Sequence, residues 1–446
     1  MDESRGSGRV PTNQTRDREM VTGEGCLPIE NKETKKRQNT ITRFTMSYDS
    51  MPKRKTTPLL MLLLTAFLRP AYGSETEPHH QGDVTDVRVI RRVDKHPLAW
   101  RIWQPVIIQG TKAKHLIAAF GAQVNGKKDM GDIVASVSKN DGDSWEEPVT
   151  IFDHRDRQGT IQFAYANPVL YRAPDQDVIW CYAMRCPISY RNSEESQLTA
   201  AFTADNGRSW TPVELAMHYT GPLILNASIV KSVINGEPRY LLPAHRNTLA
   251  ADPRGSRDHF ILSSTSLLEW KLEAFIPQPT EARVFLHEGN IAEGDRPGEL
   301  KIVMRTADYD DSSLTTSPPR AYSSVSVDGG QTWSEARPEP ELHNAKSKGY
   351  FGRSGRGTHI YVYNDGPPQR DKAPGFPNGG RTSLRYKIKP AGGEWSEEKT
   401  FYHAGIKNSY PTLIEVAPGD FRCVWDSGTA TRPRTHIQFG KLKISQ

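Results

Sequence analysis

The sequence predicts an all-β fold, and more specifically a six-bladed β-propeller that spans residues 85–446. Three observations favour this fold: a composition rich in turn residues, a hairpin-turn motif that recurs along the chain, and tryptophans that recur at a nearly constant spacing. The 446-residue chain has 35 glycines and 32 prolines. It contains no heptad run of apolar residues. Many short strands joined by turns suit this composition better than long amphipathic helices do.

The recurring motif is a turn of the form Ser-x-Asp-x-Gly-x-Thr-Trp. Residues 326–333 match it at every fixed position, residues 203–210 match with conservative replacements, and residues 138–145 carry Asn140 in the place of the aspartate. In such a turn the Asp or Asn side chain accepts backbone N–H groups, and glycine adopts a positive φ. The tryptophan then packs between neighbouring strands. The motif therefore predicts hairpins, and we expect it to be structural rather than catalytic.

The tryptophans that end the motif set the period of the repeat. Degenerate copies of the motif end in two further tryptophans, and the full set is Trp145, Trp210, Trp270, Trp333 and Trp395. Their separations are 65, 60, 63 and 62 residues. Short runs of alternating polar and apolar residues, such as 132–138 and 320–326, predict strands beside the turns. A span of this length divided by this period gives about six units, a usual blade count for propellers.

The first 73 residues lie outside the predicted propeller. Residues 1–50 are polar and lack apolar periodicity, which predicts disorder, and we interpret them as a misannotated extension ahead of a true start at Met51. Residues 51–73 have the form of a signal peptide, with basic residues, an apolar run over 58–68 and small residues before Ser74. The run is short for a stable transmembrane anchor, the alternative interpretation. We therefore expect a secreted or periplasmic protein, without a stable membrane span after signal cleavage.

Charge and cysteine usage exclude some classes of function. The formal net charge of +6 is small for this length and the basic residues are scattered, so no nucleic-acid footprint is evident. Cys181, Cys186 and Cys423 remain after the signal peptide, and both a Cys181–Cys186 disulfide and buried reduced thiols are open interpretations. No CxxC pair, histidine cluster or Asp-rich calcium loop is evident. We expect a monomer that requires no cofactor or metal.

With its turn motifs in this order, the region from about 95 to 440 resembles the exo-sialidase (neuraminidase) superfamily, whose repeats are called Asp boxes or BNR repeats. The resemblance implies the six-bladed sialidase fold and a glycan substrate. A terminal sialic acid carries a carboxylate at its anomeric carbon, and three arginines can bind this group through bidentate, charge-assisted contacts. Sialidases use a neutral tyrosine nucleophile activated by a glutamate. An aspartate protonates the leaving oxygen.

The resemblance implies three substrate-binding arginines. Arg101 lies where the family has an Arg-Ile-Pro strand, although the proline is displaced here. Arg305 follows a glutamate at nearly the family's distance, and Arg381 stands at the start of a strand after Gly379-Gly380. Arg353 and Arg356 are weaker substitutes for the third arginine.

The resemblance also implies the catalytic residues. Tyr410, in the segment Asn-Ser-Tyr-Pro-Thr-Leu-Ile, matches the position of the nucleophile, and Glu288 matches that of its base. Glu293 is a rival for the role of base. Asp129, in the loop that follows Ala-Phe at 119–120, is the candidate acid, with Asp132 as the alternative. These residues occur along the chain in the order that the family requires.

Two further positions bear on the substrate. Asn167, in Ala166-Asn167-Pro168, matches an Asn-Pro strand opening of the family and is a candidate substrate contact. Val124 stands where the family usually has an additional arginine that contacts the 4-hydroxyl of the sugar. Valine cannot make that contact, so the identity of the sugar is open.

Three functions therefore remain open from the sequence. The first is a secreted, retaining exo-sialidase-like glycoside hydrolase that releases terminal sialic acid or a related 2-keto sugar acid. The second, favoured by Val124, is a sialidase-fold polysaccharide lyase or glycosidase that acts on uronic-acid-containing polysaccharides. The third is a non-catalytic glycan-binding propeller. A full arginine triad with a Tyr/Glu pair counts against the third, because binding alone does not need an activated nucleophile.

Overall fold

The computed structural model describes most of the chain from Gln81 onward. The described residues are 81–95, 99–124, 130–155, 163–187, 196–225, 228–247, 257–280, 284–307, 320–344, 347–364, 381–404, 406–428 and 434–444. The predicted signal peptide and the segment before it lie outside these ranges. Within them the secondary structure is strand, apart from one 3-10 turn, η1 (Val93–Lys95). No helix in this part of the chain is long and apolar enough to cross a membrane.

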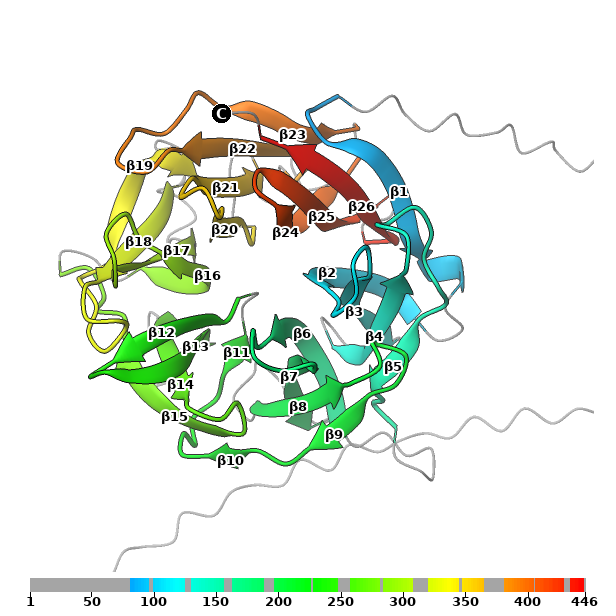
Figure 1. Ribbon diagram of the computed structural model, residues 1–446, viewed down its shortest axis with the longest axis horizontal. Helices are drawn as coiled ribbons and strands as arrows, with labels where there is room; N and C mark the ends of the chain where they lie inside the picture. The colour runs from blue at the N-terminus through cyan, green and yellow to red at the C-terminus, as the bar shows by residue number, and fades with distance from the viewer. Residues whose placement is uncertain are drawn as a thin grey trace, which may run out of the picture. The chain divides into compact units, whose positions relative to one another are not determined.

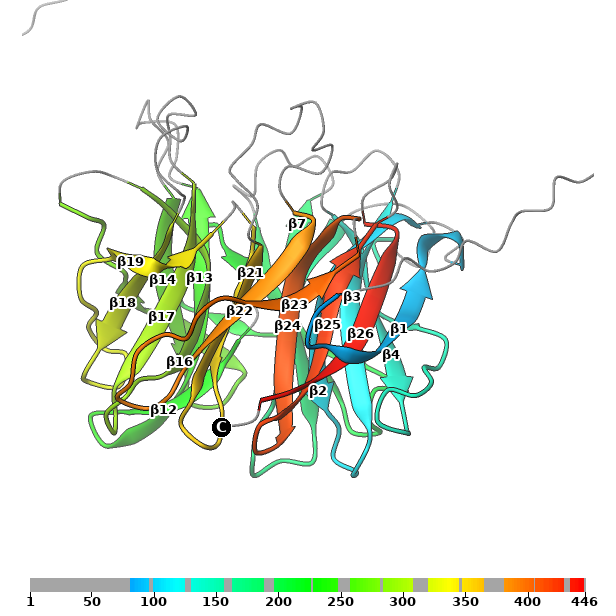
Figure 2. The ribbon, with the colours of Figure 1, turned by 90° about the horizontal axis from the view of Figure 1, so that it is seen from above.

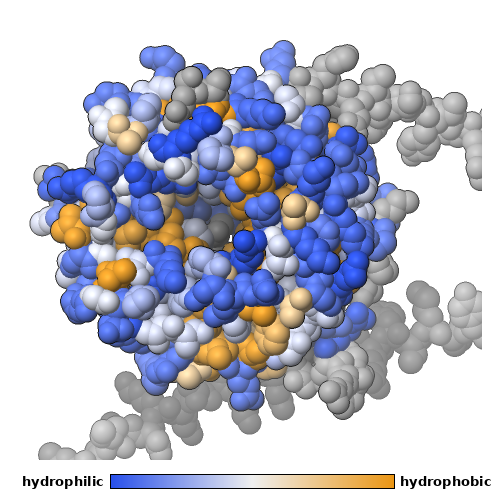
Figure 3. All heavy atoms as spheres, viewed as in Figure 1, coloured by the Kyte–Doolittle hydropathy of each residue, from blue (hydrophilic) through white to orange (hydrophobic). Residues whose placement is uncertain are grey.

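The strands pair into four hydrogen-bonded sheets, two of four strands, one of eight and one of ten. Figure 1 shows the sheets arranged in a ring, with β2, β6, β16, β20 and β24 nearest its centre, and Figure 2 shows the ring after a turn of 90°. The face seen in Figure 1 is hollowed at its centre and largely hydrophilic (Figure 3). The predicted all-β, propeller-like fold is confirmed.

The eight-stranded sheet contains two runs of four strands, which are joined by the single residue pair Gly131–Tyr165. The first run is β2 (Ala99–Gln109), β3 (Leu116–Val124), β4 (Gly131–Ser138) and β5 (Val149–Phe152). The second run is β6 (Phe163–Arg172), β7 (Ile179–Pro187), β8 (Gln197–Thr203) and β9 (Thr211–Val213). Each run is antiparallel, as expected for strands that hairpin turns connect.

The ten-stranded sheet likewise contains two groups of strands, joined by the pair Arg257–Phe285. The first group is β10 (Ala216–Met217), β11 (Ile224–Leu225), β12 (Val230–Ile234), β13 (Glu237–Asn247), β14 (Arg257–Ser264) and β15 (Glu269–Phe275). The second group is β16 (Phe285–Glu293), β17 (Leu300–Ala307), β18 (Arg320–Ser326) and β19 (Arg337–His343).

The two remaining sheets have four strands each. One is β20 (Tyr350–Arg353), β21 (His359–Asn364), β22 (Ser383–Lys389) and β23 (Lys399–His403). The other is β24 (Asn408–Ala417), β25 (Asp420–Ser427), β26 (His436–Lys443) and β1 (Thr85–Arg92). Here the first strand of the fold pairs with the last, which is visible in Figure 1 as blue β1 beside red β26. This pairing holds the two ends of the ring together, so it leaves no unpaired seam between them.

Hydrophobic cores fill the space between neighbouring runs. The largest contains Trp180 and Tyr182 of β7 together with Phe260 and Trp270 of β14 and β15. The indole of Trp270, which ends a degenerate turn motif, is fully buried and lies edge-on to Tyr182 with ring centroids 5.5 Å apart. Burial of such aromatic surface is a main source of stability in a fold of short strands.

The turn motif has the hydrogen bonds that the sequence predicts. Asp328 accepts bonds from the hydroxyl of Ser326 at 2.8 Å and from the N–H and hydroxyl of Thr332 at 2.9 and 2.6 Å. Gly330 has a φ of 105°, and an added Cβ there would lie 2.5 Å from Leu241. Burial acts to raise the pKa of Asp328, but these hydrogen bonds outweigh it and the pKa is lowered. The motif therefore stabilises a hairpin turn.

Replacing Asp328 by alanine is expected to lower the free energy of unfolding by about 1–3 kcal/mol, because the three donors lose their acceptor. Urea denaturation at pH 7 measures this difference. Val327→Ala is a matched control, since Val327 is 69% exposed and its replacement should change stability little. Equal stability of Asp328→Ala and the wild type would contradict the role of the turn.

The cysteines of the described residues are free, buried thiols. Cys181 and Cys186 lie on the same strand, β7, an odd number of residues apart, so their side chains point to opposite faces. The interpretation of a Cys181–Cys186 disulfide is therefore wrong, and the alternative of reduced thiols holds.

Candidate active site

Four inner strands, β2, β6, β16 and β24, carry the same irregularity. Each has a register shift at one residue with a positive φ, namely Gln104 (52°), Asn167 (54°), Glu288 (49°) and Tyr410 (55°). Such angles are uncommon for residues other than glycine. Proline follows three of these residues and Gly289 the fourth, and proline has no N–H to lose from the ladder. Strained bulges of this kind cluster at functional sites, and three of the four residues are candidate site residues from the sequence.

Glu288, Arg305 and Tyr410 form the core of the site. The Arg305 guanidinium donates to the Glu288 carboxylate over 2.5 Å, and the exposed fractions of the two side chains are only 14% and 9%. Burial acts to lower the pKa of Arg305, but the charge of Glu288 and contacts with Glu288 and Tyr410 outweigh it, so the pKa is raised. The structure thus brings together a predicted base, a predicted arginine and the predicted nucleophile.

Glu288 is ionised despite its burial. Burial acts to raise the pKa of its carboxyl group, but the positive charges of Arg305, Lys348 and Arg381 outweigh it, and the pKa is lowered. At neutral pH Glu288 is therefore a carboxylate that can accept a proton.

Two guanidinium groups lie beside the Tyr410 ring. The Cζ atom of Arg381 is 5.5 Å from the ring centroid and that of Arg434 is 5.2 Å away. Arg434 also lies 4.0 Å from the carboxylate of Asp426, which is completely buried and accepts a hydrogen bond from the Ser409 hydroxyl. Arg381 is a predicted site residue. Arg434 is one that the sequence analysis missed, because nothing in its local sequence distinguishes it.

Two lysines complete the cluster. Burial, together with the positive charges of Arg434, Arg381 and Arg101, lowers the pKa of Lys407 to about 7, so Arg101 belongs to the same cluster. Burial lowers the pKa of Lys348 to about 8. Neither lysine was predicted, although Lys407 stands only three residues before the tyrosine, which is a signal that could have been used.

Lys407→Met is expected to raise the free energy of unfolding by about 1–4 kcal/mol at pH 6, because it removes a buried charge. The lysine is charged in the unfolded chain up to about pH 10.5, but in the folded protein only up to about pH 7. The unfolded state therefore binds more protons between these values, and the stability of the wild type rises with pH there. Urea denaturation at pH 6 and pH 9 should show a gain that shrinks at the higher pH; an equal gain at both would contradict the account.

Two histidines support the bulge that carries Glu288. The N–H of Glu288 lies 3.4 Å from Nδ1 of His245, and the N–H of Gly289 donates to Nε2 of His259 at 3.2 Å. Burial lowers the pKa of His259 to about 3, so its imidazole is neutral and can accept this bond. The histidines thus hold the strained backbone in place.

Some predicted residues have other partners or lie outside the described ranges. Asn167 donates from its side chain to the Leu225 carbonyl at 3.0 Å, which ties β6 to β11. Glu293, the rival base, ends β16, and its side chain is 70% exposed. It pairs at 3.0 Å with Arg353 of β20, the substitute arginine. Asp129, the candidate acid, lies outside the described residues.

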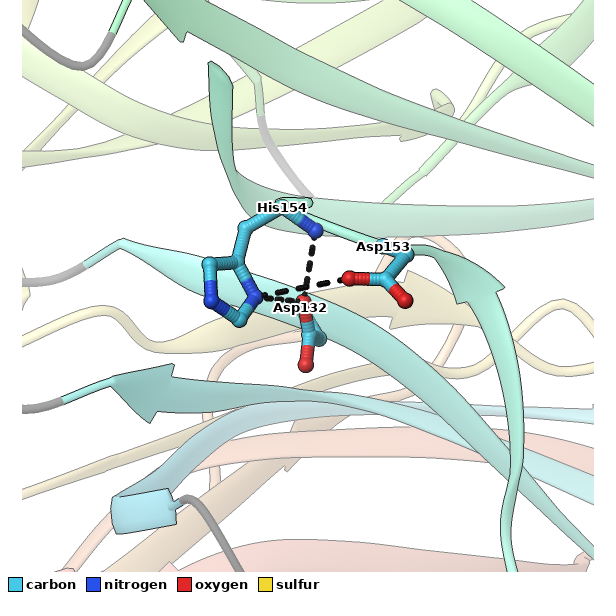
Figure 4. A group of neighbouring side chains, drawn as sticks. All are labelled: Asp132, Asp153 and His154. Atoms are coloured by element: carbon cyan, nitrogen blue, oxygen red, sulfur yellow. Dashed lines mark hydrogen bonds and ion pairs between the residues drawn. The ribbon is translucent and has the colours of Figure 1, made fainter. Parts of the chain in front are cut away.

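Asp132, the alternative acid, is buried and lies in a cluster with the buried His154 and the exposed Asp153 (Figure 4). Its carboxylate lies 2.5 Å from Nδ1 of His154 and accepts the His154 N–H at 2.7 Å. The carboxylate of Asp153 is 3.6 Å from the same Nδ1. These atoms are close enough to one another to hold a metal ion, but the bond between His154 and Asp132 indicates a buried His–Asp pair at the start of β4.

Comparisons with known proteins agree with this architecture. A family model described as a BNR repeat-like domain matches residues 114–423. No curated protein sequence matches the chain. A protein of unknown function from Dyadobacter fermentans has a similar structure, with 18% identity, a TM-score of 0.59 and coverage of 82% of this chain and 100% of that one.

Solved sialidase structures are also similar. A Hadza microbial sialidase has 16% identity and a TM-score of 0.59, over 80% of this chain and 68% of that one. The intramolecular trans-sialidase from Ruminococcus gnavus has 12% identity and a TM-score of 0.57, over 80% of this chain and 97% of that one. At these identities the likeness concerns the fold alone.

Proposed function

Because this chain belongs to the family of BNR repeat-like domains and shares the fold of sialidases, we propose that it is a retaining exo-sialidase-like glycoside hydrolase. It releases terminal sialic acid or a related 2-keto sugar acid from glycans. The observation that carries the proposal is the contact of Arg305 with both Glu288 and Tyr410, beside Arg381. The proposal includes export by the segment 51–73.

The proposal also includes six blades of four main strands each. Its support is the pairing pattern, since the eight- and ten-stranded sheets are each held together by one residue pair and would divide there into two blades. The motif tryptophans, about 62 residues apart, give the same count.

In the proposed mechanism Arg101, Arg305 and Arg381 bind the carboxylate of the sugar acid. The Tyr410 oxygen attacks the anomeric carbon while Glu288 accepts the phenolic proton, and the bond to the leaving oxygen breaks as Asp129 protonates that oxygen. Water then attacks the same carbon, Asp129 takes its proton, and Tyr410 leaves and recovers its proton from Glu288. A neutral tyrosine suits this task because a carboxylate nucleophile would meet the carboxylate of the substrate.

A release assay tests the proposed function. The purified protein is incubated with a chromogenic α-sialoside and, in parallel, with a panel of uronic-acid-containing polysaccharides. We expect release from the sialoside, and none from the protein with Tyr410→Phe. Depolymerisation of a uronic-acid polysaccharide without sialoside turnover would instead support the lyase or glycosidase alternative. Binding of glycans without turnover of any substrate would support a non-catalytic propeller.

A further inference from the structure

Several cationic side chains of the described residues lie around Tyr410. In the described part of the chain the cations of this cluster are Arg101, Arg305, Arg381, Arg434, Lys348 and Lys407. The carboxylates are Glu288 and Asp426. This cluster is the basic end of the site, and two of its members, Lys348 and Lys407, are lysines that the proposed binding of the anomeric carboxylate does not use.

Both carboxylates are already engaged. Glu288 pairs with Arg305 at 2.5 Å. Asp426 accepts the Ser409 hydroxyl and the Gln104 N–H, the latter at 3.4 Å, and lies 4.0 Å from Arg434. Neither carboxylate lies within 4.0 Å of a lysine of the cluster, so both carboxylates interact mainly with arginines.

The two lysines lie where burial makes the charged form of a side chain unfavourable. Lys348 is 5% exposed, and among the residues that the structure describes neither it nor Lys407 forms an ion pair. Lys407 lies next to β24 and shares its surroundings with three arginines. Burying a charge without a partner costs several kcal/mol, so a ligand that supplies the partner would gain affinity there.

We propose that the substrate carries a second anionic group besides its carboxylate, and that Lys348, Lys407 and Arg434 hold this group. The second group is a sulfate ester or a second carboxylate, which share the chemistry that a lysine ammonium recognises as a point charge. The inference rests on the proposed function, because it assigns the anomeric carboxylate to the three predicted arginines.

The site would thus offer two kinds of anion contact. Arg101, Arg305 and Arg381 can bind the anomeric carboxylate in a bidentate manner, whereas the ammonium groups of Lys348 and Lys407, with Arg434, need no fixed angle and suit the tetrahedral oxygens of a sulfate. Because the pKa of Lys407 is lowered to about 7, an anion bound beside it should favour the protonated lysine. Affinity should therefore depend on the charge of the ligand more than on its size.

Binding and turnover measured side by side test this inference. The probes are an α-sialoside, the same sialoside with one O-sulfate at each hydroxyl in turn, and an unsulfated disaccharide of two uronic acids. Calorimetry gives the Kd of each, with wild-type protein and with Lys348→Met and Lys407→Met. We expect at least one dianionic probe to bind at least about tenfold more tightly than the parent sialoside, and each lysine variant to lose most of that preference.

Lys271→Met is the matched control, since Lys271 lies on the outer strand β15 with a side chain 54% exposed, and it should keep the preference. Tight binding of a sulfated sialoside identifies a sulfate as the second anion, whereas tight binding of the uronic acid disaccharide identifies a carboxylate. Wild-type protein that binds no dianionic probe better than the parent overturns the inference, as does a preference that survives in both lysine variants. Release of the sugar from the unmodified α-sialoside tests the proposed function separately, so a failure of that function can be told from a failure of this inference. Thermal unfolding of each variant verifies that it is folded.

Discussion

Tyr410→Phe is expected to lower kcat for release of the sugar acid by at least about 10³-fold, while the affinity for a non-hydrolysed analogue stays within about threefold. The substitution removes only the hydroxyl. The ring, which is 5% exposed and lies beside Arg381 and Arg434, can keep its place. Release kinetics give kcat, and calorimetry with a glycal of sialic acid gives the affinity.

A second tyrosine provides the control for that experiment. The hydroxyl of Tyr386 donates to the carboxylate of Asp83 at 2.6 Å, but Tyr386 packs in a core between the last two sheets rather than in the site. Tyr386→Phe should therefore change stability and leave the rate of each folded molecule near that of the wild type. Residual activity of Tyr410→Phe within tenfold of the wild type would contradict the nucleophilic role.

Arg305→Met is expected to lower both stability and activity, the first by about 3–5 kcal/mol, because it leaves the buried Glu288 carboxylate without its counter-charge. In the wild type the pKa of Glu288 is lowered, so the pair contributes stability above the unfolded pKa that is lost as the pH falls. In the variant the folded pKa of Glu288 rises, so the loss should be small at acidic pH and grow as the pH increases. Urea denaturation at pH 5 and pH 8 measures it.

The same strand offers a matched ion pair for comparison. Glu293 and Arg353 lie 3.0 Å apart, but Glu293 is 70% exposed, so Arg353→Met should cost less than about 1 kcal/mol at either pH. The double variant Arg305→Met/Glu288→Gln should recover stability without recovering activity. An equal loss in the free energy of unfolding for Arg305→Met and Arg353→Met would contradict the role given to the burial of the Glu288–Arg305 pair.

The repeat could be predicted from the sequence because its chemistry is local. The turn at 326–333 specifies its own hydrogen bonds through Asp328 and Thr332, and the fixed positions are adjacent along the chain. The tryptophan at its end marks the period. Pairing of β1 with β26 has no such local signal, since the two strands are more than 300 residues apart in the sequence.

The candidate site was predictable only where the strand itself is unusual. Tyr410, Asn167 and Gln104 each precede a proline, so a residue followed by proline marks three of the four bulges in the sequence. Arg434 and Lys348 reach the site from segments without a motif. Their burial beside other cations follows from how distant strands meet at the centre, and a single lysine or arginine in a sequence is more often a solvated surface residue.

Trapping the intermediate shows which atom of the protein the sugar acid is bonded to during turnover. A sialoside with fluorine at C3 slows formation and hydrolysis of the intermediate, because fluorine destabilises the cationic transition state, and peptide mass spectrometry then locates the adduct. The account predicts one adduct, on the peptide that contains Tyr410, and none on the protein with Tyr410→Phe. An adduct on a carboxylate side chain, or steady release of the sugar without any adduct on Tyr410, would contradict it.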